Sequence, residues 1–380
     1  MRGAGTWLAT ALLAAAPPAA AQTVYIAFGD SITAGSFDDP ARAQKGYPPR
    51  LEDLLVARGV DAVVVNHGMP GESTAEALSR IDGVLAGGGD VLLLMEGTND
   101  VGARVSNETI LTNLSILANR AENQGLEVVH GTIIPRHPTA SYDPRNIVTR
   151  DIAGGTRELA WEEGRNLADP FEAFRHLIPD AFDTLYVGGE DKLHPNAAGY
   201  DALAEVFADA LTGVDEVWPV IGRLFPHDDA QGVDPRQEIV IDLYDFGAGI
   251  DVDATRLLVG EEEVPAEITG DERLQRIRYR PDTPFSGVVF LGLEAQDLAT
   301  PPNRREGTLL QFVVAGATFL TGDITRDGRV DGADLVDFAR AFGAQKGTSR
   351  YKGFADLNGD NVVDGNDLAI LASNFGERSF

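Results

Sequence analysis

Four short blocks in the first part of the chain contain the side chains that an attack on a carbonyl carbon requires. They are GDSIT at 29–33, NHGMPG at 66–71, GTND at 97–100 and DKLHP at 191–195. A serine hydroxyl is a weak nucleophile until a base removes its proton, and imidazole is the natural base near neutrality. Ser31 would be the nucleophile, His194 the base and Asp191 the carboxylate that fixes the imidazole tautomer. These residue types predict acyl transfer.

The same blocks contain donors for the negative charge that develops on the attacked carbonyl oxygen. We expect the backbone N–H groups of Ser31 and Gly71 and the side-chain amide of Asn99 to form this oxyanion hole. Each block alone also fits an ordinary turn rich in Gly, Asn and Asp. The prediction therefore depends on all four blocks occurring together and in this order.

In this order the four blocks resemble those of the SGNH or GDSL hydrolase family, over about half of the chain. The resemblance implies, for the residues named above, the roles of nucleophile, base, orienting carboxylate and oxyanion donors. Gly71 is favoured over Gly68 because the family's glycine stands five residues after the asparagine of its block, here Asn66. A G-x-S-x-G elbow is not supported, since neither 29–33 nor 71–75 ends in glycine.

The segments between the blocks alternate short apolar runs with longer amphipathic stretches. The runs at 23–28, 61–66, 90–95 and 126–134 predict buried strands. Helices are predicted from Tyr47, from Ser73, through 110–117 and over 196–211, with Pro195 beginning the last one. This alternation predicts a parallel sheet with helices on both faces, and the resemblance implies a three-layer α/β/α, flavodoxin-like fold. Ligands bind such sheets beyond the carboxyl ends of the strands, where the blocks fall.

Residues 214–318 have a different texture. Short β-like segments such as QEIVIDLYDF, TRLLVG and VVFLGLEAQD are separated by Gly, Pro and Asp. This pattern predicts a small β-sandwich. The stretches IDLYDFGAGID and QDLATPPN resemble bacterial immunoglobulin-like modules, a resemblance that concerns the fold alone.

The last stretch contains an internal repeat, in which residues 322–343 match residues 355–376. Calcium prefers six to eight hard oxygen ligands, and each copy is an acid-rich loop of twelve residues that closes on a helix. We expect two structural calcium sites, with Gly328 and Asn361 at the sharp turns. The ligands expected at positions 1, 3, 5, 7 (by its carbonyl), 9 and 12 are Asp323, Thr325, Asp327, Arg329, Asp331 and Asp334, and then Asp356, Asn358, Asp360, Val362, Asp364 and Asp367.

The helix after each loop is predicted to have one apolar face, since apolar residues recur at i, i+3 and i+7. Position 12 of each loop is Asp and not the Glu of an EF-hand, and the helix that follows ends in Phe-Gly. This combination resembles a type I dockerin over 322–376. The resemblance implies a cohesin partner and a polysaccharide-degrading assembly. Gly332-Ala333 and Gly365-Asn366 stand where many cellulosomal dockerins have hydroxyl residues. A calcium-stabilised tail without a cohesin partner is therefore the alternative.

Residues 1–21 are typical of an export signal, with Arg2, a short apolar core and a small-residue end. We expect cleavage after Ala21 and a secreted protein; the alternative is a retained membrane anchor. The chain has no cysteine, so stability must come from packing and metal rather than disulfides. A net charge of -28 argues against nucleic acid and anionic membranes as partners.

We therefore expect a signal peptide (1–21), an SGNH/GDSL hydrolase domain (22–213), a β-sandwich (214–318) and a dockerin-like calcium-binding domain (319–380). The predicted function is a serine esterase that needs no cofactor for catalysis, with acetyl groups on a polysaccharide as the expected substrate. A lipase, lysophospholipase or thioesterase at the same site is the enzymatic alternative. An adhesion or scaffold protein with an inactive first domain is the non-enzymatic one.

Two other histidines lie in or near the predicted strands. His67 is expected to be structural or on the surface, with a place near the site as the alternative, and His130 is expected to be a core residue.

Overall fold

The computed structural model describes residues 22–137, 144–177, 181–188, 191–215, 217–227, 230–306, 308–315, 320–325, 329–345, 352, 354–358 and 360–378. The predicted signal peptide, Asp327 and Gly328 lie outside the described residues. Within the described part of the chain, none of the helices combines the length and the apolar character needed to cross a bilayer.

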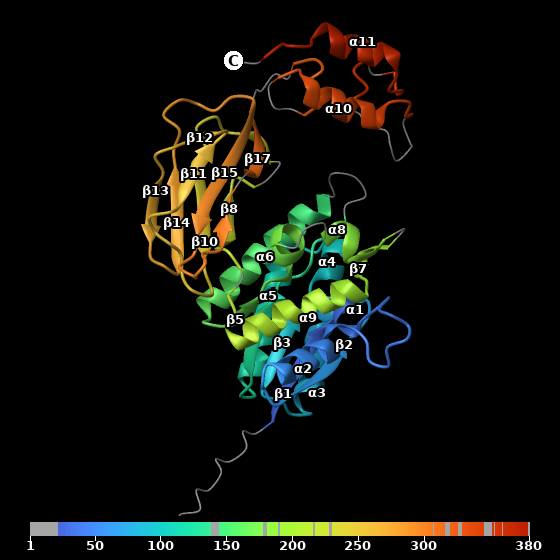
Figure 1. Ribbon diagram of the computed structural model, residues 1–380, viewed down its shortest axis with the longest axis vertical. Helices are drawn as coiled ribbons and strands as arrows, with labels where there is room; N and C mark the ends of the chain where they lie inside the picture. Colours follow the sequence, from blue (N-terminus) through green and yellow to red (C-terminus); the bar gives the residue numbers. More distant parts are fainter. Residues whose placement is uncertain are drawn as a thin grey trace, which may run out of the picture.

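The first domain is built on a parallel sheet of five strands in the order β2-β1-β3-β4-β5 (Figure 1). The strands are β1 (Thr23–Gly29), β2 (Ala62–Gly68), β3 (Val91–Met95), β4 (Glu127–Gly131) and β5 (Asn166–Ala168). This strand order is that of the flavodoxin-like folds, so the predicted fold class is confirmed. Gly29 pairs with both Gly68 and Met95, so the first three strands end side by side. The first three blocks leave the sheet at this shared edge.

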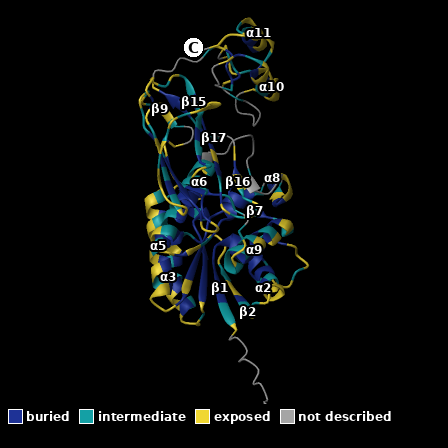
Figure 2. Ribbon diagram, turned by 60° about the vertical axis from the view of Figure 1, so that its left-hand side comes forward, coloured by how far each residue is buried: buried dark blue, intermediate teal, exposed yellow. Residues whose placement is uncertain are grey.

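Helices cover both faces of the sheet. Figure 2 shows α3 and α5 on one side of the strands and α2 and α9 on the other. The long helices are α2 (Tyr47–Ala57), α3 (Thr74–Leu85), α5 (Asn107–Glu122), α6 (Pro144–Glu162) and α9 (Ala197–Thr212). The short elements are α1 (Ser31–Ala34), α4 (Thr98–Ala103), α7 (Pro170–Glu172), the π-helical η1 (Ala173–Leu177), α8 (Ala181–Thr184) and the hairpin strands β6 (Tyr186–Gly188) and β7 (Asp191–Pro195).

Helix α6 was not predicted from the sequence, because Gly154 and Gly155 interrupt its apolar pattern. Both glycines allow close packing. A Cβ on Gly154 would lie 2.5 Å from the carbonyl oxygen of Gly222, and one on Gly155 would lie 2.3 Å from a methyl group of Leu111. The two residues therefore let α6 approach the second domain on one side and α5 on the other.

The second domain consists of two sheets that enclose one cluster of buried apolar residues, so the β-sandwich is confirmed. One sheet has the order β13-β14-β10-β8, and the other β12-β11-β15-β17-β9, with β16 paired to β15. The strands are β8 (Val220–Phe225), β9 (Ala230–Val233), β10 (Ile239–Tyr244), β11 (Arg256–Val259), β12 (Glu262–Glu263), β13 (Glu267–Gly270), β14 (Leu274–Tyr279), β15 (Val288–Gln296), β16 (Arg304–Arg305) and β17 (Thr308–Val314).

A buried ionic network joins the first two domains. The guanidinium of Arg157 on α6 binds Asp169 at 2.7 Å and Glu172 at 2.9 Å. From the second domain, Arg305 forms an ion pair with Glu172, and the indole N–H of Trp218 donates to the same carboxylate at 2.6 Å. The side chains of Arg157 and Glu172 are each only 2% exposed, so the charge of Glu172 depends on partners from both domains.

The third domain has two helices, α10 (Gly332–Ala341) and α11 (Gly365–Ser373), each opened by an Asp capping box. Three apolar residues at i, i+3 and i+7 were predicted to form one face of each helix. Only the middle one is buried: Phe338 in α10 and Leu371 in α11 are each 1% exposed. The outer members are exposed, in part because α10 and α11 end before the last of them; they are Leu335, Phe342, Leu368 and Phe375. The predicted apolar face of each helix is therefore buried only at its middle residue.

Candidate active site

Ser31 is presented by the turn that connects β1 to α1. The carboxylate of Asp30 caps α1 by accepting the Ile32 N–H at 2.8 Å, which makes Ser31 the first helical residue. Glycine is required at position 29, because a Cβ there would lie 2.4 Å from the carbonyl oxygen of Met95 on the neighbouring strand. The close approach of β1 and β3 thus fixes the level at which Ser31 leaves the sheet.

Ser31, His194 and Asp191 form one hydrogen-bonded triad. Ser31 Oγ lies 2.9 Å from His194 Nε2, and His194 Nδ1 lies 2.8 Å from Asp191 Oδ2. The other carboxylate oxygen of Asp191 accepts the backbone N–H groups of Leu193 and His194, both at 2.9 Å. Burial raises the pKa of Asp191, but these hydrogen bonds outweigh it and hold the pKa below its usual value. Asp191 is therefore an anion when the imidazole receives a proton.

The block DKLHP lies on strand β7 and not at the start of a helix. Pro195 pairs with Tyr186 of β6, and the last helix begins at Ala197 behind its cap Asn196, so the expected helix start at Pro195 is wrong. The Asn196 amide donates to the carbonyls of Thr184 and Tyr186 at 2.8 and 2.9 Å. These bonds anchor the strand that carries His194.

The second block provides two glycines with different roles. The N–H of Gly68 already donates to Asn66 Oδ1 at 2.9 Å, and a Cβ on Gly68 would lie 2.1 Å from the backbone nitrogen of Ala34. Gly68 is thus a close-packing position. Gly71 has a φ of 82° and open space around its Cα, as a backbone donor facing a ligand would require. These observations favour Gly71 over Gly68 as an oxyanion donor.

Asn99 is brought to the same loop from the start of α4. Its side-chain amide donates to the carbonyl of Glu72, the residue after Gly71, at 2.8 Å. The neighbouring carboxylate of Asp100 accepts the backbone N–H and the hydroxyl of Thr74, at 2.9 and 2.7 Å. Asp100, which sequence reasoning did not single out, therefore ties the third block to the beginning of α3.

Buried acids lie behind the serine, and sequence reasoning missed them as well. Asp30 and Glu96 are each 1% exposed. Burial raises the pKa of Asp30 to about 6, although hydrogen bonds from Ile32 and Thr98 oppose it. Burial and the charges of Asp30 and Glu72 raise the pKa of Glu96 well above its usual value.

In the portion of the first domain that the structure describes, neither His67 nor His130 forms a hydrogen bond with the triad residues, and the two differ in burial. His67 is half-buried at the end of β2, where burial and then Arg80 lower its pKa. His130 is fully buried in β4, as expected of a core residue; burial and Arg165 lower its pKa to about 4, so it is neutral.

One further ring contacts the triad. The aromatic ring of Phe37 lies 4.9 Å from the imidazole of His194, measured between centroids, and the two planes are tilted by 40°. Phe37 is 64% exposed. No motif marks this residue, so the sequence alone did not draw attention to it.

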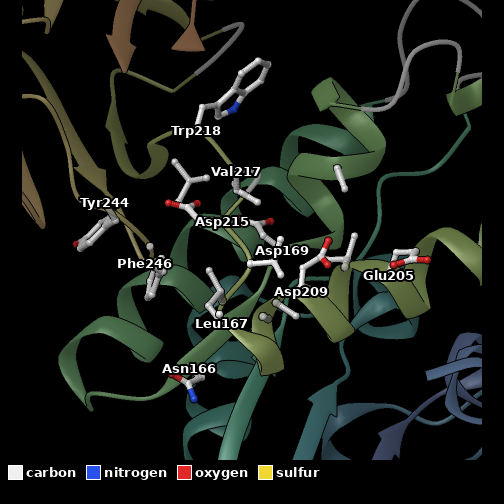
Figure 3. A pocket seen from close by; sticks show the side chains of 18 of the residues that line it. Asn166, Leu167, Asp169, Glu205, Asp209, Asp215, Val217, Trp218, Tyr244 and Phe246 are labelled. Carbon is white, nitrogen blue, oxygen red and sulfur yellow. The ribbon is translucent and has the colours of Figure 1, made fainter. Parts of the chain in front are cut away.

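A cavity of about 540 Å³ lies away from these residues, at the junction of the first two domains. Figure 3 shows Glu205 and Asp209 of α9 on one side of it and Tyr244 and Phe246 of the sandwich on the other. Both acids are ion-paired with Arg58, at 2.7 and 2.6 Å. Its lining includes no residue of the four blocks, so the cavity is a feature of the domain junction and not of the hydrogen-bonded triad.

The two acidic loops of the third domain are similar to one another. Asp334 and Asp367, at position 12, are fully buried and accept backbone N–H groups of their own loops. Asp356 accepts the N–H groups of Asp360 and Asn361 at 3.1 and 2.8 Å, and Asn361 has the expected left-handed φ of 71°. Among the described residues, which lack Asp327, no three acidic or histidine side chains converge to hold a metal. The donor set of hard oxygens nonetheless fits a calcium ion chemically.

Comparison with known proteins matches two of the three domains. Residues 27–202 match the GDSL-like Lipase/Acylhydrolase family, and residues 321–375 match the Dockerin type I domain. An arylesterase of Vibrio mimicus is 31% identical over 105 residues, which are 27% of this chain and 51% of the relative. Esterase TesA of Pseudomonas aeruginosa is 32% identical over 139 residues, which are 36% of this chain and 65% of the relative. The chain thus spans between half and two thirds of the length of these curated relatives.

Among solved structures, an acetylxylan esterase from Geobacillus stearothermophilus is 22% identical, covers 50% of this chain and 94% of its own, and has a TM-score of 0.44. The flavodoxin-like strand order, the first three blocks at one edge of that sheet and the paired acidic loops agree with the two family matches. The first domain of this chain is a GDSL-like lipase/acylhydrolase domain, and the last is a dockerin type I domain.

Proposed function

We propose that the protein hydrolyses carboxylic esters through an acyl intermediate on Ser31. The observation that supports this proposal most directly is the hydrogen-bonded triad, with 2.9 Å from Ser31 Oγ to His194 Nε2 and 2.8 Å from His194 Nδ1 to Asp191. In the first step His194 takes the hydroxyl proton while Oγ attacks the ester carbonyl carbon. The resulting imidazolium is stabilised by Asp191, whose low pKa keeps it ionised.

The proposed oxyanion hole consists of the N–H groups of Ser31 and Gly71 and the amide of Asn99. These donors would bind the carbonyl oxygen as it becomes negative. Collapse of the tetrahedral intermediate breaks the ester C–O bond, and His194 gives its proton to the departing alcohol. Water, deprotonated by His194, then attacks the acyl group and releases the acid, which returns Ser31 to its starting state.

The substrate class that we propose is an acetylated polysaccharide. The support is the dockerin type I domain on the same chain, since such domains belong to polysaccharide-degrading assemblies. A lipase, lysophospholipase or thioesterase at this site is the second candidate, favoured by the match to the GDSL-like Lipase/Acylhydrolase family and to Esterase TesA. In a non-enzymatic adhesion or scaffold protein, nothing would require the triad to keep hydrogen-bonding geometry.

The test is a series of p-nitrophenyl esters from acetate to palmitate, assayed beside acetylated xylan. A preference for acetate together with release of acetate from xylan supports the proposal, whereas a rise in kcat/KM toward long chains supports the lipase alternative. Ser31→Ala must abolish hydrolysis of every ester in the series. A variant as active as the unaltered protein would exclude Ser31 as the nucleophile.

We further propose export with cleavage after Ala21, and the domain boundaries 22–213, 214–318 and 319–380. Mass spectrometry of the secreted protein tests the first proposal, because the mature chain would begin at Gln22.

For the dockerin domain we propose two calcium ions held by the twelve loop positions named above, and a cohesin module as partner. Pull-down with cohesin modules, with and without a chelator, tests both.

A further inference from the structure

Phe37 is an exposed aromatic residue in a backbone conformation that side chains rarely adopt. Its φ is 65°, in the left-handed region that favours glycine, and its ring is 64% exposed. Exposure of this ring brings no burial energy, and the backbone conformation opposes folding. Such a combination is retained where the surrounding structure imposes it, and it is concentrated at binding and active sites.

The backbone on the N-terminal side of Phe37 is firmly held. The N–H of Ser36 donates to the carbonyl of Ser31 at 2.9 Å. The hydroxyl of Tyr200, a fully buried residue of α9, donates to the carbonyl of Ser36 at 2.7 Å. Phe37 is thus tied both to the nucleophile's own turn and to the helix that follows His194.

The C-terminal side is held by Asp38, whose side chain is completely buried. Arg50 binds its two carboxylate oxygens at 2.7 and 2.9 Å, and the N–H of Gly46 donates to it at 2.9 Å. Burial raises the pKa of Asp38, but Arg50 and the backbone donors bring it below its usual value, so the pair is ionic. The backbone that carries Phe37 is therefore held on both sides, and it presents the ring beside His194.

The contact with His194 tells which part of an ester would meet this ring. In the proposed reaction His194 protonates the departing alcohol, so the alcohol lies next to the imidazole. The oxyanion donors Gly71 and Asn99 come from two other strand ends and would hold the carbonyl oxygen there. A ring 4.9 Å from the imidazole is therefore on the side of the site that receives the alcohol.

The surroundings of Phe37 indicate what kind of alcohol fits. The segment 36–46, SFDDPARAQKG, has no other large apolar side chain, and Asp39 and Lys45 are among its charged ones. An exposed flat apolar ring in a loop whose other side chains are polar or small suits a sugar ring, which has an apolar C–H face and hydroxyl groups around its edge. A long alkyl alcohol would need a continuous apolar groove.

We propose that Phe37 is the platform on which the sugar ring of the departing alcohol stacks, and that it sets the preference of this enzyme for carbohydrate esters over simple alkyl esters. This inference rests on the proposed esterase function of Ser31 and deepens it by assigning the alcohol side of the site. Phe37 contacts substrate and takes no part in proton transfer.

The test compares two acetate esters, so that the acyl side is constant: acetylated xylo-oligosaccharide and ethyl acetate. The measured quantity is the ratio of their kcat/KM values in the full-length protein. Phe37→Ala is expected to lower this ratio about tenfold through a higher KM for the sugar ester. Phe37→Trp, which keeps a flat ring, is expected to restore it. Phe354→Ala is the matched control, since Phe354 is also an exposed phenylalanine (44%) and lies in the third domain.

An unchanged ratio in Phe37→Ala would overturn the proposal. So would an equal fall of both kcat/KM values, because a ring that only orients His194 affects every ester alike. Unaltered protein that hydrolyses ethyl acetate but not the sugar ester would also overturn it, while leaving the esterase function in place. Protein that hydrolyses neither ester would contradict the esterase function itself.

Discussion

Ser31 Oγ and His194 Nε2 lie 2.9 Å apart although 163 positions separate the two residues in the chain. The contact joins the end of β1, which lies between β2 and β3, to strand β7, which is not part of the five-stranded sheet. Its geometry is maintained by the Asn196 bonds to Thr184 and Tyr186 and by the Asp191 bonds to the backbone around His194.

Asp191→Asn is expected to lower kcat for p-nitrophenyl acetate by about 10²–10⁴-fold, the range of general base catalysis, because an amide cannot stabilise the imidazolium. The KM should change little, since Asp191 does not contact substrate. Asp53→Asn, at an exposed position of α2, is the control and should behave as the unaltered protein. Equal kcat values for the two variants would remove Asp191 from the mechanism.

Asn99→Ala is expected to lower kcat by about 10²–10³-fold, the usual effect of losing one oxyanion donor. The substitution also removes the hydrogen bond to the Glu72 carbonyl, so the melting temperature must be measured beside kcat. A loss of kcat at unchanged secondary structure and with a small shift in Tm identifies an oxyanion donor. A higher KM with an unchanged kcat would show instead that Asn99 only shapes the loop.

Asp30→Asn is expected to stabilise the protein above about pH 6 and to have little effect on stability near pH 4. The folded pKa of about 6 lies above the ordinary 3.8, so the native state binds the proton more tightly between these values. Wild-type stability therefore falls as the pH rises through this window, and the neutral amide avoids this fall. This pKa shift of Asp30 corresponds to a loss of folding stability of at most about 3 kcal/mol at neutral pH, at 1.36 kcal/mol for each pKa unit. Urea unfolding at pH 4.5 and 7.5 measures it, and a difference independent of pH would refute the explanation.

Arg157→Ala is expected to destabilise the protein by about 3–5 kcal/mol, because Asp169 and Glu172 would remain buried with less positive charge beside them. Arg280→Ala is the comparison, since its side chain is 77% exposed and its ion pair with Glu238 should contribute less than about 1 kcal/mol. Denaturant unfolding of both variants gives the two values. Similar small losses would mean that the network is not a source of stability.

Millimolar calcium is expected to raise the melting temperature of one transition in calorimetry of the full-length protein, and EDTA to reverse the rise. Asp356→Asn, at position 1 of the second loop, should reduce the shift. Asp337→Asn, on α10 outside both loops and paired with Arg340, should leave it intact. No calcium-dependent shift in the unaltered protein would exclude the calcium proposal.

The sequence was sufficient for four of the five strands of the sheet, because short apolar runs predicted β1, β2, β3 and β4, whereas β5 was missed. The first three blocks begin within or just after β1, β2 and β3, so their meeting at one edge follows from parallel pairing. The predicted pairing of Asp191 with His194 is present as a hydrogen bond of 2.8 Å. Asp191 reaches the imidazole through an Asp turn on a strand, which has the same three-residue spacing as one turn of a helix.

The features that were missed depend on contacts between distant residues. Glycines at 154 and 155 weaken helix propensity, and their packing value appears only when Gly222 and Leu111 are placed beside them. Phe37 stands in a polar loop without any periodic pattern, so its position beside His194 has no local signal. The acids Asp30 and Glu96 have unusual pKa values only because strands from separate segments bury them together.

The buried network at Glu172 also determines how this chain can be divided and reused. A cut between α9 and β8 would leave Glu172 without Arg305 and Trp218, and would expose the face of α6 on which Gly222 packs. A cut after β17 leaves both intact. The first domain and the sandwich are therefore one transferable unit, and the third domain alone can be exchanged without breaking this network.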